Sequence, residues 1–204
     1  LSPKVNITIT GAATTTGDLA TIIAATNGAV VLNPQTIAAA YSDTAANLVA
    51  AFDGISTLTS VLTIAGTDPA TVAELLTINA ATSGDVVLNA ETNAANLNDT
   101  AANLAAAFSG ITTSTGNLTI AGTTPATIAE LITINAATSG AVVLNPETIV
   151  QDYDDTAANL AAAFDGINTS TAILTITADT PAATIVELIA INAATSGNVV
   201  LNAQ

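Results

Sequence analysis

The heptapeptide INAATSG occurs three times in this chain, at residues 78–84, 134–140 and 191–197, identical in every letter. The copies start 56 and then 57 residues apart. An active site needs no further copies of itself, whereas a stack of equivalent structural units does. The heptapeptide therefore predicts a repeat architecture before it predicts any chemistry.

The similarity extends outward from the heptapeptide in both directions. The segment reads LTIAGTDPATVAELLTINAATSGDVVLN from Leu62, and close copies begin at Leu118 and Leu174, with a weaker copy from Ile7. A second segment, DTAANLAAAFDGI or a close variant, begins at Asp43, Asp99 and Asp155. Each period of 56 residues thus holds two half-units of about 28, and each half-unit reads as one helix and one short strand.

Both predicted helices carry signals at their ends. Asp43, Asp99 and Asp155 are predicted N-caps, and Gly54, Gly110 and Gly166 are predicted left-handed C′ residues followed by an apolar Ile. In the other helix we expect the proline at the first position and a glutamate near the N-terminus, which the helix dipole favours. These residues are Pro69, Pro125 and Pro181, and Glu74, Glu130 and Glu187.

Helices that alternate with strands predict an α/β fold with parallel strands joined by right-handed crossovers. We expect eight strands, seven helices and one sheet in a solenoid similar to the leucine-rich repeat proteins. Helices on opposite faces of the sheet are the second alternative. The prediction is a single domain over residues 1–204, with double repeats at 7–61, 62–117 and 118–173 and a partial one at 174–204.

Composition limits the partners. The formal charge is −15, yet only 8% of the 204 residues are charged, and Lys4 is the only cation. Such a chain cannot neutralise a nucleic-acid backbone, and no apolar run reaches the roughly 18 residues that span a membrane. We therefore expect neither nucleic-acid binding nor membrane insertion.

Catalytic residue types are few. His, Cys and Arg are absent, and the aligned carboxylates obey the repeat, which is typical of structural positions. We expect no enzyme activity, no cofactor and no metal site. Calcium is the one metal ion for which the sequence offers candidate ligands, because some aspartates lie beside glycine turns or cluster in sequence. No EF-hand loop is present. These aspartates are Asp53, Asp165, Asp152, Asp154 and Asp155.

Two series of asparagines repeat with the period. A side-chain amide repeated at one level of a solenoid can bond the backbone of the neighbouring coil, so each series is a predicted ladder. One series ends the strands at Asn33, Asn89, Asn145 and Asn202, and the other lies inside the heptapeptide at Asn79, Asn135 and Asn192.

Strand alternation predicts a β-branched row on the face of the sheet that points away from the helices. The row is most often simple strand propensity, but it is also a candidate surface for lateral contacts or for ice binding. It consists of Thr8, Val31, Thr63, Val87, Thr119, Val143, Thr175 and Val200.

The segments DTAANLAAAF and PATIAELITINAATSG resemble repeat segments of very large secreted bacterial proteins, including cyanobacterial proteins related to calcium-dependent adhesins and exoproteins. The resemblance implies an extracellular or cell-surface location and a structural or adhesive role. It transfers no site residues.

These observations lead to one functional hypothesis and one alternative. The hypothesis is a structural protein, a subunit of a filament or a segment of a surface fibre, that assembles head to tail with copies of itself. The edges that would meet are Ile7 and Ile9 at one end and Val199, Val200 and Leu201 at the other, since uncapped coils expose strand edges. The alternative is an adhesive module that binds glycan, ice or protein on the exposed sheet face.

Overall fold

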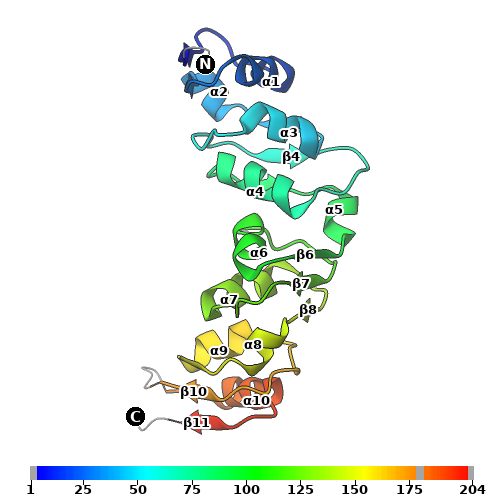
Figure 1. Ribbon diagram of the computed structural model, residues 1–204, viewed down its shortest axis with the longest axis vertical. Helices are drawn as coiled ribbons and strands as arrows, with labels where there is room; N and C mark the ends of the chain where they lie inside the picture. Colours follow the sequence, from blue (N-terminus) through cyan, green and yellow to red (C-terminus); the bar gives the residue numbers. More distant parts are fainter. Residues whose placement is uncertain (1–3, 178–181, 202–204) are drawn as a thin grey trace. The chain divides into compact units, whose positions relative to one another are not determined.

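The computed structural model describes residues 4–177 and 182–201. The described chain divides into two compact units, the first ending at Ala94 and the second beginning at Ala95. Short parallel strands alternate with helices throughout both units, as Figure 1 shows. The α/β class and the repeat-like organisation predicted from the sequence are thereby confirmed. The single domain over 1–204 stays a prediction.

The first unit contains five strands and five helices among its described residues. They are β1 (Ile7–Thr8), α1 (Thr16–Ala25), β2 (Val30–Val31), α2 (Pro34–Ala38), β3 (Tyr41–Asp43), α3 (Ala45–Phe52), β4 (Leu62–Ile64), α4 (Val72–Ala81), β5 (Val86–Val87) and α5 (Ala90–Ala94).

The second unit repeats the same order. Its described elements are β6 (Leu97–Asp99), α6 (Ala101–Ala107), β7 (Leu118–Ile120), α7 (Ile128–Ala137), β8 (Val142–Val143), α8 (Pro146–Val150), β9 (Tyr153–Asp155), α9 (Ala157–Ala163), β10 (Leu174–Ile176), α10 (Ile185–Ala194) and β11 (Val199–Leu201).

The predicted count of eight strands and seven helices is wrong, because each period holds an additional strand and an additional five-residue helix. The additional strands are β3, β6 and β9, and the additional helices are α2, α5 and α8. In α2 and α8 the helix begins at a proline that follows an asparagine N-cap. Each period therefore contains three strands and three helices, where two of each were expected.

The strands do not form one sheet. They form one pair, β1–β2, and three parallel triplets, β3–β4–β5, β6–β7–β8 and β9–β10–β11. Within a triplet the register is regular, since Tyr41 lies beside Leu62 and Leu62 beside Val86. The short helix after β2, β5 and β8 separates each group from the next strand, and this corrects the expectation of a continuous sheet.

The helix starts also differ from the expectation. Thr44, Thr100 and Thr156 are the N-caps of α3, α6 and α9, and the preceding aspartate accepts from the threonine amide and from an asparagine one turn later. The last residue of each strand, Asp43, Asp99 or Asp155, is therefore not the N-cap but accepts hydrogen bonds from the N-cap and from the first helical turn. A strand that ends immediately before the helix leaves the N-cap position to the next residue.

The longer helices begin after their prolines. Thr71, Thr127 and Thr184 cap α4, α7 and α10, each in a reciprocal capping box with the glutamate three residues later. The prediction that Pro69 and Pro125 take the first helical position is therefore wrong, and Pro181 lies outside the described residues. The predicted place of the glutamates near the helix N-termini is confirmed.

The helix ends are as predicted in backbone angle. Gly54, Gly110 and Gly166 have φ values of 74°, 77° and 69°, in the left-handed region that favours glycine. The amide of the following isoleucine donates to the phenylalanine carbonyl three residues earlier, which makes a tight turn. These isoleucines are buried and close the core at this end of each helix.

The core of each unit lies between the strands and the longer helices. In the second unit, α7 packs on α6 and on α9, and α9 packs on α10. Leu104, Leu131 and Leu160 have no exposed surface, and Phe164 meets Tyr153 edge-on with ring centroids 5.6 Å apart. Aliphatic layers with few aromatic rings fill this core, as the composition indicates.

Candidate functional site

The asparagines at the strand ends connect neighbouring half-units of the repeat, each of which we call a coil. Asn145 donates through Nδ2 to the carbonyls of Gly122 and Thr124, at 3.0 Å each, while its Oδ1 accepts from the amide of Thr148 at 3.0 Å. The same side chain therefore caps α8 and bonds the preceding coil. Asn33 and Asn89 make equivalent contacts, and Asn202 lies outside the described residues.

A buried threonine adds a second connection at the same level. The hydroxyl of Thr148 has no exposed surface and accepts from the amide of Ala126 at 2.8 Å, and Tyr153 donates to the Ala126 carbonyl at 2.7 Å. Burial raises the pKa of the Tyr153 hydroxyl to about 12. Sequence reasoning missed this cluster, although the spacing Asn-x-x-Thr in NPET and NAET carries the signal of a capped turn.

The end of the heptapeptide makes the closest approach between coils. Thr138 donates through Oγ1 to the carbonyl of Gly116 at 2.6 Å and accepts from the amide of Gly140 at 2.9 Å. A Cβ atom at position 140 would lie 2.5 Å from the Gly116 carbonyl oxygen, so only glycine fits there. Equivalent bonds recur at Thr82 and Thr195, and these contacts account for the threonine and the glycine of TSG in all three copies.

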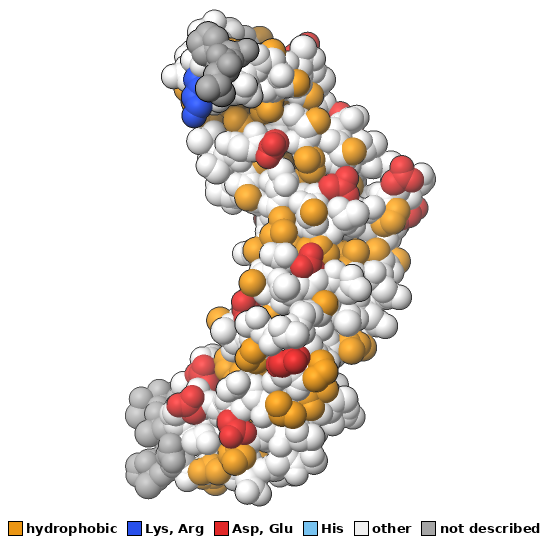
Figure 2. All heavy atoms as spheres, in the orientation of Figure 1, with side chains coloured by type: hydrophobic (Ala, Val, Ile, Leu, Met, Phe, Trp, Pro, Cys, Tyr) orange, Lys and Arg blue, Asp and Glu red, His pale blue; other side chains and the backbone are white. Residues whose placement is uncertain are grey.

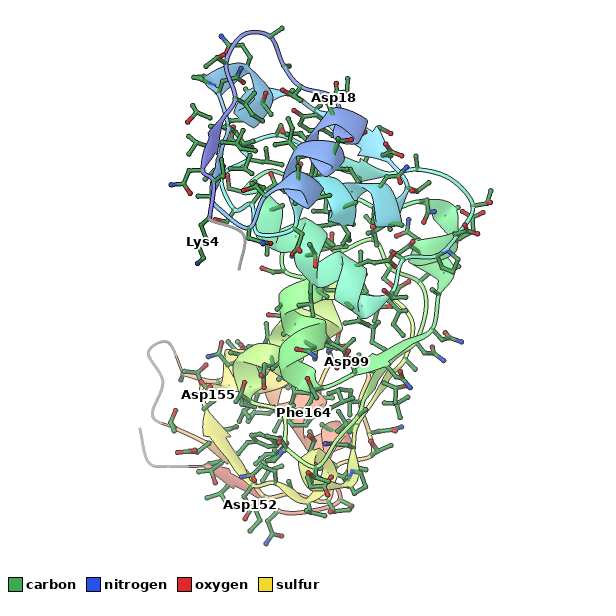
Figure 3. The ribbon with its side chains drawn as sticks, turned by 45° about the horizontal axis from the view of Figure 1, so that its top comes forward. Lys4, Asp18, Asp99, Asp152, Asp155 and Phe164 are labelled. Atoms are coloured by element: carbon green, nitrogen blue, oxygen red, sulfur yellow. The ribbon has the colours of Figure 1, made fainter. Side chains whose placement is uncertain are left out.

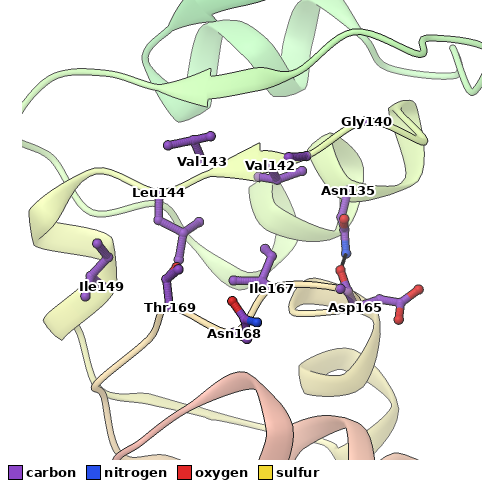
Figure 4. A pocket seen from close by; sticks show the side chains of 12 residues that line it. Asn135, Gly140, Val142, Val143, Leu144, Ile149, Asp165, Ile167, Asn168 and Thr169 are labelled. Carbon is purple, nitrogen blue, oxygen red and sulfur yellow. Dashed lines mark hydrogen bonds between the residues drawn. The ribbon is translucent and has the colours of Figure 1, made fainter.

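The asparagine of the heptapeptide points to the following coil. Asn135 is half-buried, and its Nδ2 donates to the carbonyls of Ala162 and Asp165, at 3.1 and 2.9 Å, near the end of α9 (Figure 4). Asn79 is half-buried as well, whereas Asn192 on α10 is exposed. The heptapeptide thus bonds the coil before it through threonine and, at Asn135, the coil after it through asparagine.

A shallow groove of about 330 Å³ lies beside Asn135, where β8 has no strand partner on its outer edge. Val142, Leu144 and Ile167 line it together with the exposed Asn168, and the turn after α9 forms its far side (Figure 4). The first unit has a groove at the equivalent place, between residues 23–30 and 53–55. Asp165 is the only titratable residue of the groove in the second unit.

The outward face of the triplets is more polar than the predicted row. Thr63 and Val87 lie in register with Ser42, Thr119 and Val143 with Asn98, and Thr175 and Val200 with Asp154. The three threonines in the middle strands are half-buried, while the valines are 39–51% exposed, and Thr8 beside Val31 is exposed. A polar strand thus interrupts the β-branched row in each period, and the row extends over separate sheets.

The carboxylates lie apart from one another. They are spread over the visible face of both units in Figure 2, and Asp152 and Asp155 are well separated in Figure 3 although they are close in sequence. Asp152 accepts from the amide of Ile173 at 2.7 Å, and Asp154 points to the opposite side of its strand from Asp155. Within residues 4–177 and 182–201, no three acidic side chains gather as metal ligands would.

Asp43 is the carboxylate with the most partners in the first unit. Hydrogen bonds from the Thr16 hydroxyl at 2.7 Å and from the Asn47 amide at 2.7 Å lower the pKa of its carboxyl below the usual value. These bonds tie α1 to the start of α3. The hydrogen bonds to Asp43 therefore give this carboxylate a structural role.

Among the described residues, the two most exposed large aliphatic side chains lie on α10. Ile185 and Val186 are 76% exposed and Ile189 is 64% exposed, and Leu201 on the edge strand β11 is 62% exposed. The equivalent of Ile185 on α7 is Ile128, which is only 8% exposed. Of the predicted edges, Val199 is half-buried and Val200 exposed, whereas at the other end Ile7 is half-buried and Ile9 is buried. The predicted assembly edges include β11 but not α10, although α10 contributes more exposed apolar side chains.

No helix of the described chain is both long and apolar enough to cross a bilayer. Comparisons with protein-family models, with curated proteins and with solved structures found no match.

Proposed function

We propose that this chain is an extracellular structural protein, a segment or subunit of a surface fibre. Its 56-residue repeats would stack as an α/β solenoid similar in principle to the leucine-rich repeat proteins, and copies would join head to tail. The resemblance of DTAANLAAAF and PATIAELITINAATSG to repeats of large secreted bacterial proteins supports the location.

The observation that carries the proposal is the use made of the repeated polar residues. Asn145, Thr148, Thr138 and Asn135 all bond backbone of a neighbouring coil, with donor–acceptor distances of 2.6–3.1 Å. Residues selected for a binding site would face solvent, whereas these residues connect one coil to the next. Such contacts stabilise each repeat against its neighbour, as in a stack of repeats.

The α10 face supports assembly by stacking. Monomeric proteins rarely expose several large aliphatic side chains together, and such patches usually mark contact surfaces. Ile185, Val186 and Ile189 form such a patch beside the unpaired edge of β11. A contact between this face and the first coil of another copy would be heterologous, so it would propagate instead of closing into a dimer.

Sedimentation velocity over a wide range of protein concentrations tests the proposal. We expect the mean mass to rise without limit as concentration rises, and we expect the variant Ile185→Asp to shift this growth to higher concentration. Val150→Asp is the matched control, because Val150 is 65% exposed but belongs to α8 and not to α10. A wild-type chain that stays monomeric, or that stops at a dimer, would contradict head-to-tail growth.

A further inference from the structure

Strand β8 has one backbone edge that pairs with no strand of the described chain. Its register places Val142 beside Leu118, and the Leu118 amide donates to the carbonyl of Ala141 at 3.0 Å. Backbone groups of successive strand residues point alternately to the two edges. The amide and carbonyl of Val142 therefore point away from β7, and so do those of Leu144, two residues later.

This open edge forms one wall of the groove beside Asn135, and the turn after α9 forms the other (Figure 4). Leu144 and Ile167 are buried at the groove, Val142 is half-buried, and Asn168 is exposed. The groove thus presents backbone donors and acceptors next to aliphatic side chains. A polypeptide in the extended conformation matches both features.

The first unit contains the same arrangement. The Ile7 amide donates to the carbonyl of Ala29 at 2.9 Å and Ile7 pairs with Val30, so the backbone groups of Val30 point to the outer edge of β2. Val30 and the turn at Gly54 line the groove there. In both units a five-residue helix follows the open strand, and the next strand belongs to another triplet. The open edge is therefore an internal feature of the repeat.

Charge indicates which kind of strand fits. Asp165 in the second unit and Asp53 in the first are exposed, and each is the titratable residue that lines its groove. The whole chain carries a formal charge of −15, with Lys4 as its only cation. A basic segment is attracted to such a groove, whereas a second copy of this chain brings like charge to it.

We propose that the groove beside β8 binds an extended basic segment of a partner protein as an additional strand. The segment bonds the outward backbone groups of Val142 and Leu144, its aliphatic side chains contact Ile167, and a lysine or arginine lies against Asp165. Residues 142–144 span about 7 Å at about 3.3 Å per residue, which matches about three residues of the partner. Main-chain hydrogen bonds supply the affinity in this mode of binding, and alternate side chains supply the specificity. The site lies along the repeat and does not depend on head-to-tail assembly.

The probe is a synthetic heptapeptide in which valine and threonine alternate between a lysine at each end, with acetyl and amide termini. Hydrogen exchange of single amides in the whole chain, followed by nuclear magnetic resonance, reports on the strand edge. At saturating peptide we expect exchange of the Val142 amide to slow at least about tenfold, because the amide gains an acceptor. The Val143 amide is an internal control, since it points to β7 and should not change.

Two altered peptides and two charge variants test the assignment of the groove. A peptide with N-methyl groups on alternate residues cannot donate along one edge and should lose binding, and a peptide with glutamate in place of both lysines should bind at least about fivefold more weakly. Asp165→Lys should reverse the order of the lysine and glutamate peptides. Asp154→Lys is the matched control, because Asp154 is also exposed but does not line the groove.

Failure of the lysine peptide to bind overturns the inference, and so does binding that leaves exchange at Val142 unchanged. Unchanged affinity of the N-methylated peptide overturns strand pairing. Equal effects of Asp165→Lys and Asp154→Lys would show attraction to the net charge alone and would overturn the assignment of Asp165. None of these results depends on fibre growth, so peptide binding without growth refutes only the proposed function, and growth without peptide binding refutes only this inference.

Discussion

Replacing Thr148 by valine removes one hydrogen bond between coils and leaves the shape of the side chain nearly unchanged. Thr148 has no exposed surface, and Ala126, whose amide donates to its hydroxyl at 2.8 Å, is 2% exposed. In the variant the Ala126 amide has no acceptor and no access to water. Leaving a buried donor unpaired costs about 1–3 kcal/mol, so we expect the free energy of unfolding to fall by this amount.

The assay is urea unfolding followed by far-ultraviolet circular dichroism, because the chain contains no tryptophan. Thr112→Val is the matched control, since Thr112 is exposed and a surface substitution usually changes stability by less than about 0.5 kcal/mol. Hydrogen exchange of the Ala126 amide gives a local measure and should be faster in Thr148→Val. Equal unfolding midpoints for the two variants, with unchanged exchange at Ala126, would refute the assignment of Thr148 as a connection between coils.

Three further predictions concern the other coil contacts. Gly140→Ala should destabilise the protein severely, because the added Cβ would lie 2.5 Å from the Gly116 carbonyl oxygen. Gly17→Ala is the control and should be neutral or slightly stabilising, because no atom lies near its Cβ. Thermal unfolding compares the two variants, and equal effects would contradict the close approach at Gly140. Asn135→Leu should lower the free energy of unfolding by about 0.5–1.5 kcal/mol, because two carbonyls near the end of α9 lose their donor but stay accessible to water. An unchanged urea midpoint would argue against this contact. The free energy of unfolding should fall as pH rises from 10 to about 12, because the unfolded chain ionises its tyrosines first while burial raises the pKa of Tyr153 to about 12. In urea titrations at each pH, Tyr153→Phe should make this decrease smaller by roughly 1–2 kcal/mol. An identical pH profile for the variant would count against burial of the hydroxyl.

The sequence indicated the longer elements well, because their signals are local. Periodic apolar residues located α4, α7 and α10 within a few residues, and Gly110 marked the end of α6 through its backbone angle. The capping box at Thr127 shows why the start was misplaced: both a proline and a threonine followed by glutamate signal a helix start, and the threonine prevails.

The short elements could not be predicted from periodicity. A strand such as β6 has three residues and α5 has five, too few for either period to be visible. Pairing with β7 defines β6, and backbone bonds from Asn89 accompany α5, so both depend on neighbouring coils. The exposed face of α10 is likewise a property of packing, since Ile185 and Ile128 occupy the same position of the repeat but differ in what covers them.

Electron micrographs of the purified chain test most directly whether the repeat serves to stack copies of the chain. The account predicts unbranched fibres of constant width that lengthen with protein concentration, and that become shorter or rarer for the double variant Ile185→Asp, Ile189→Asp. Single separated particles at every concentration would contradict head-to-tail stacking.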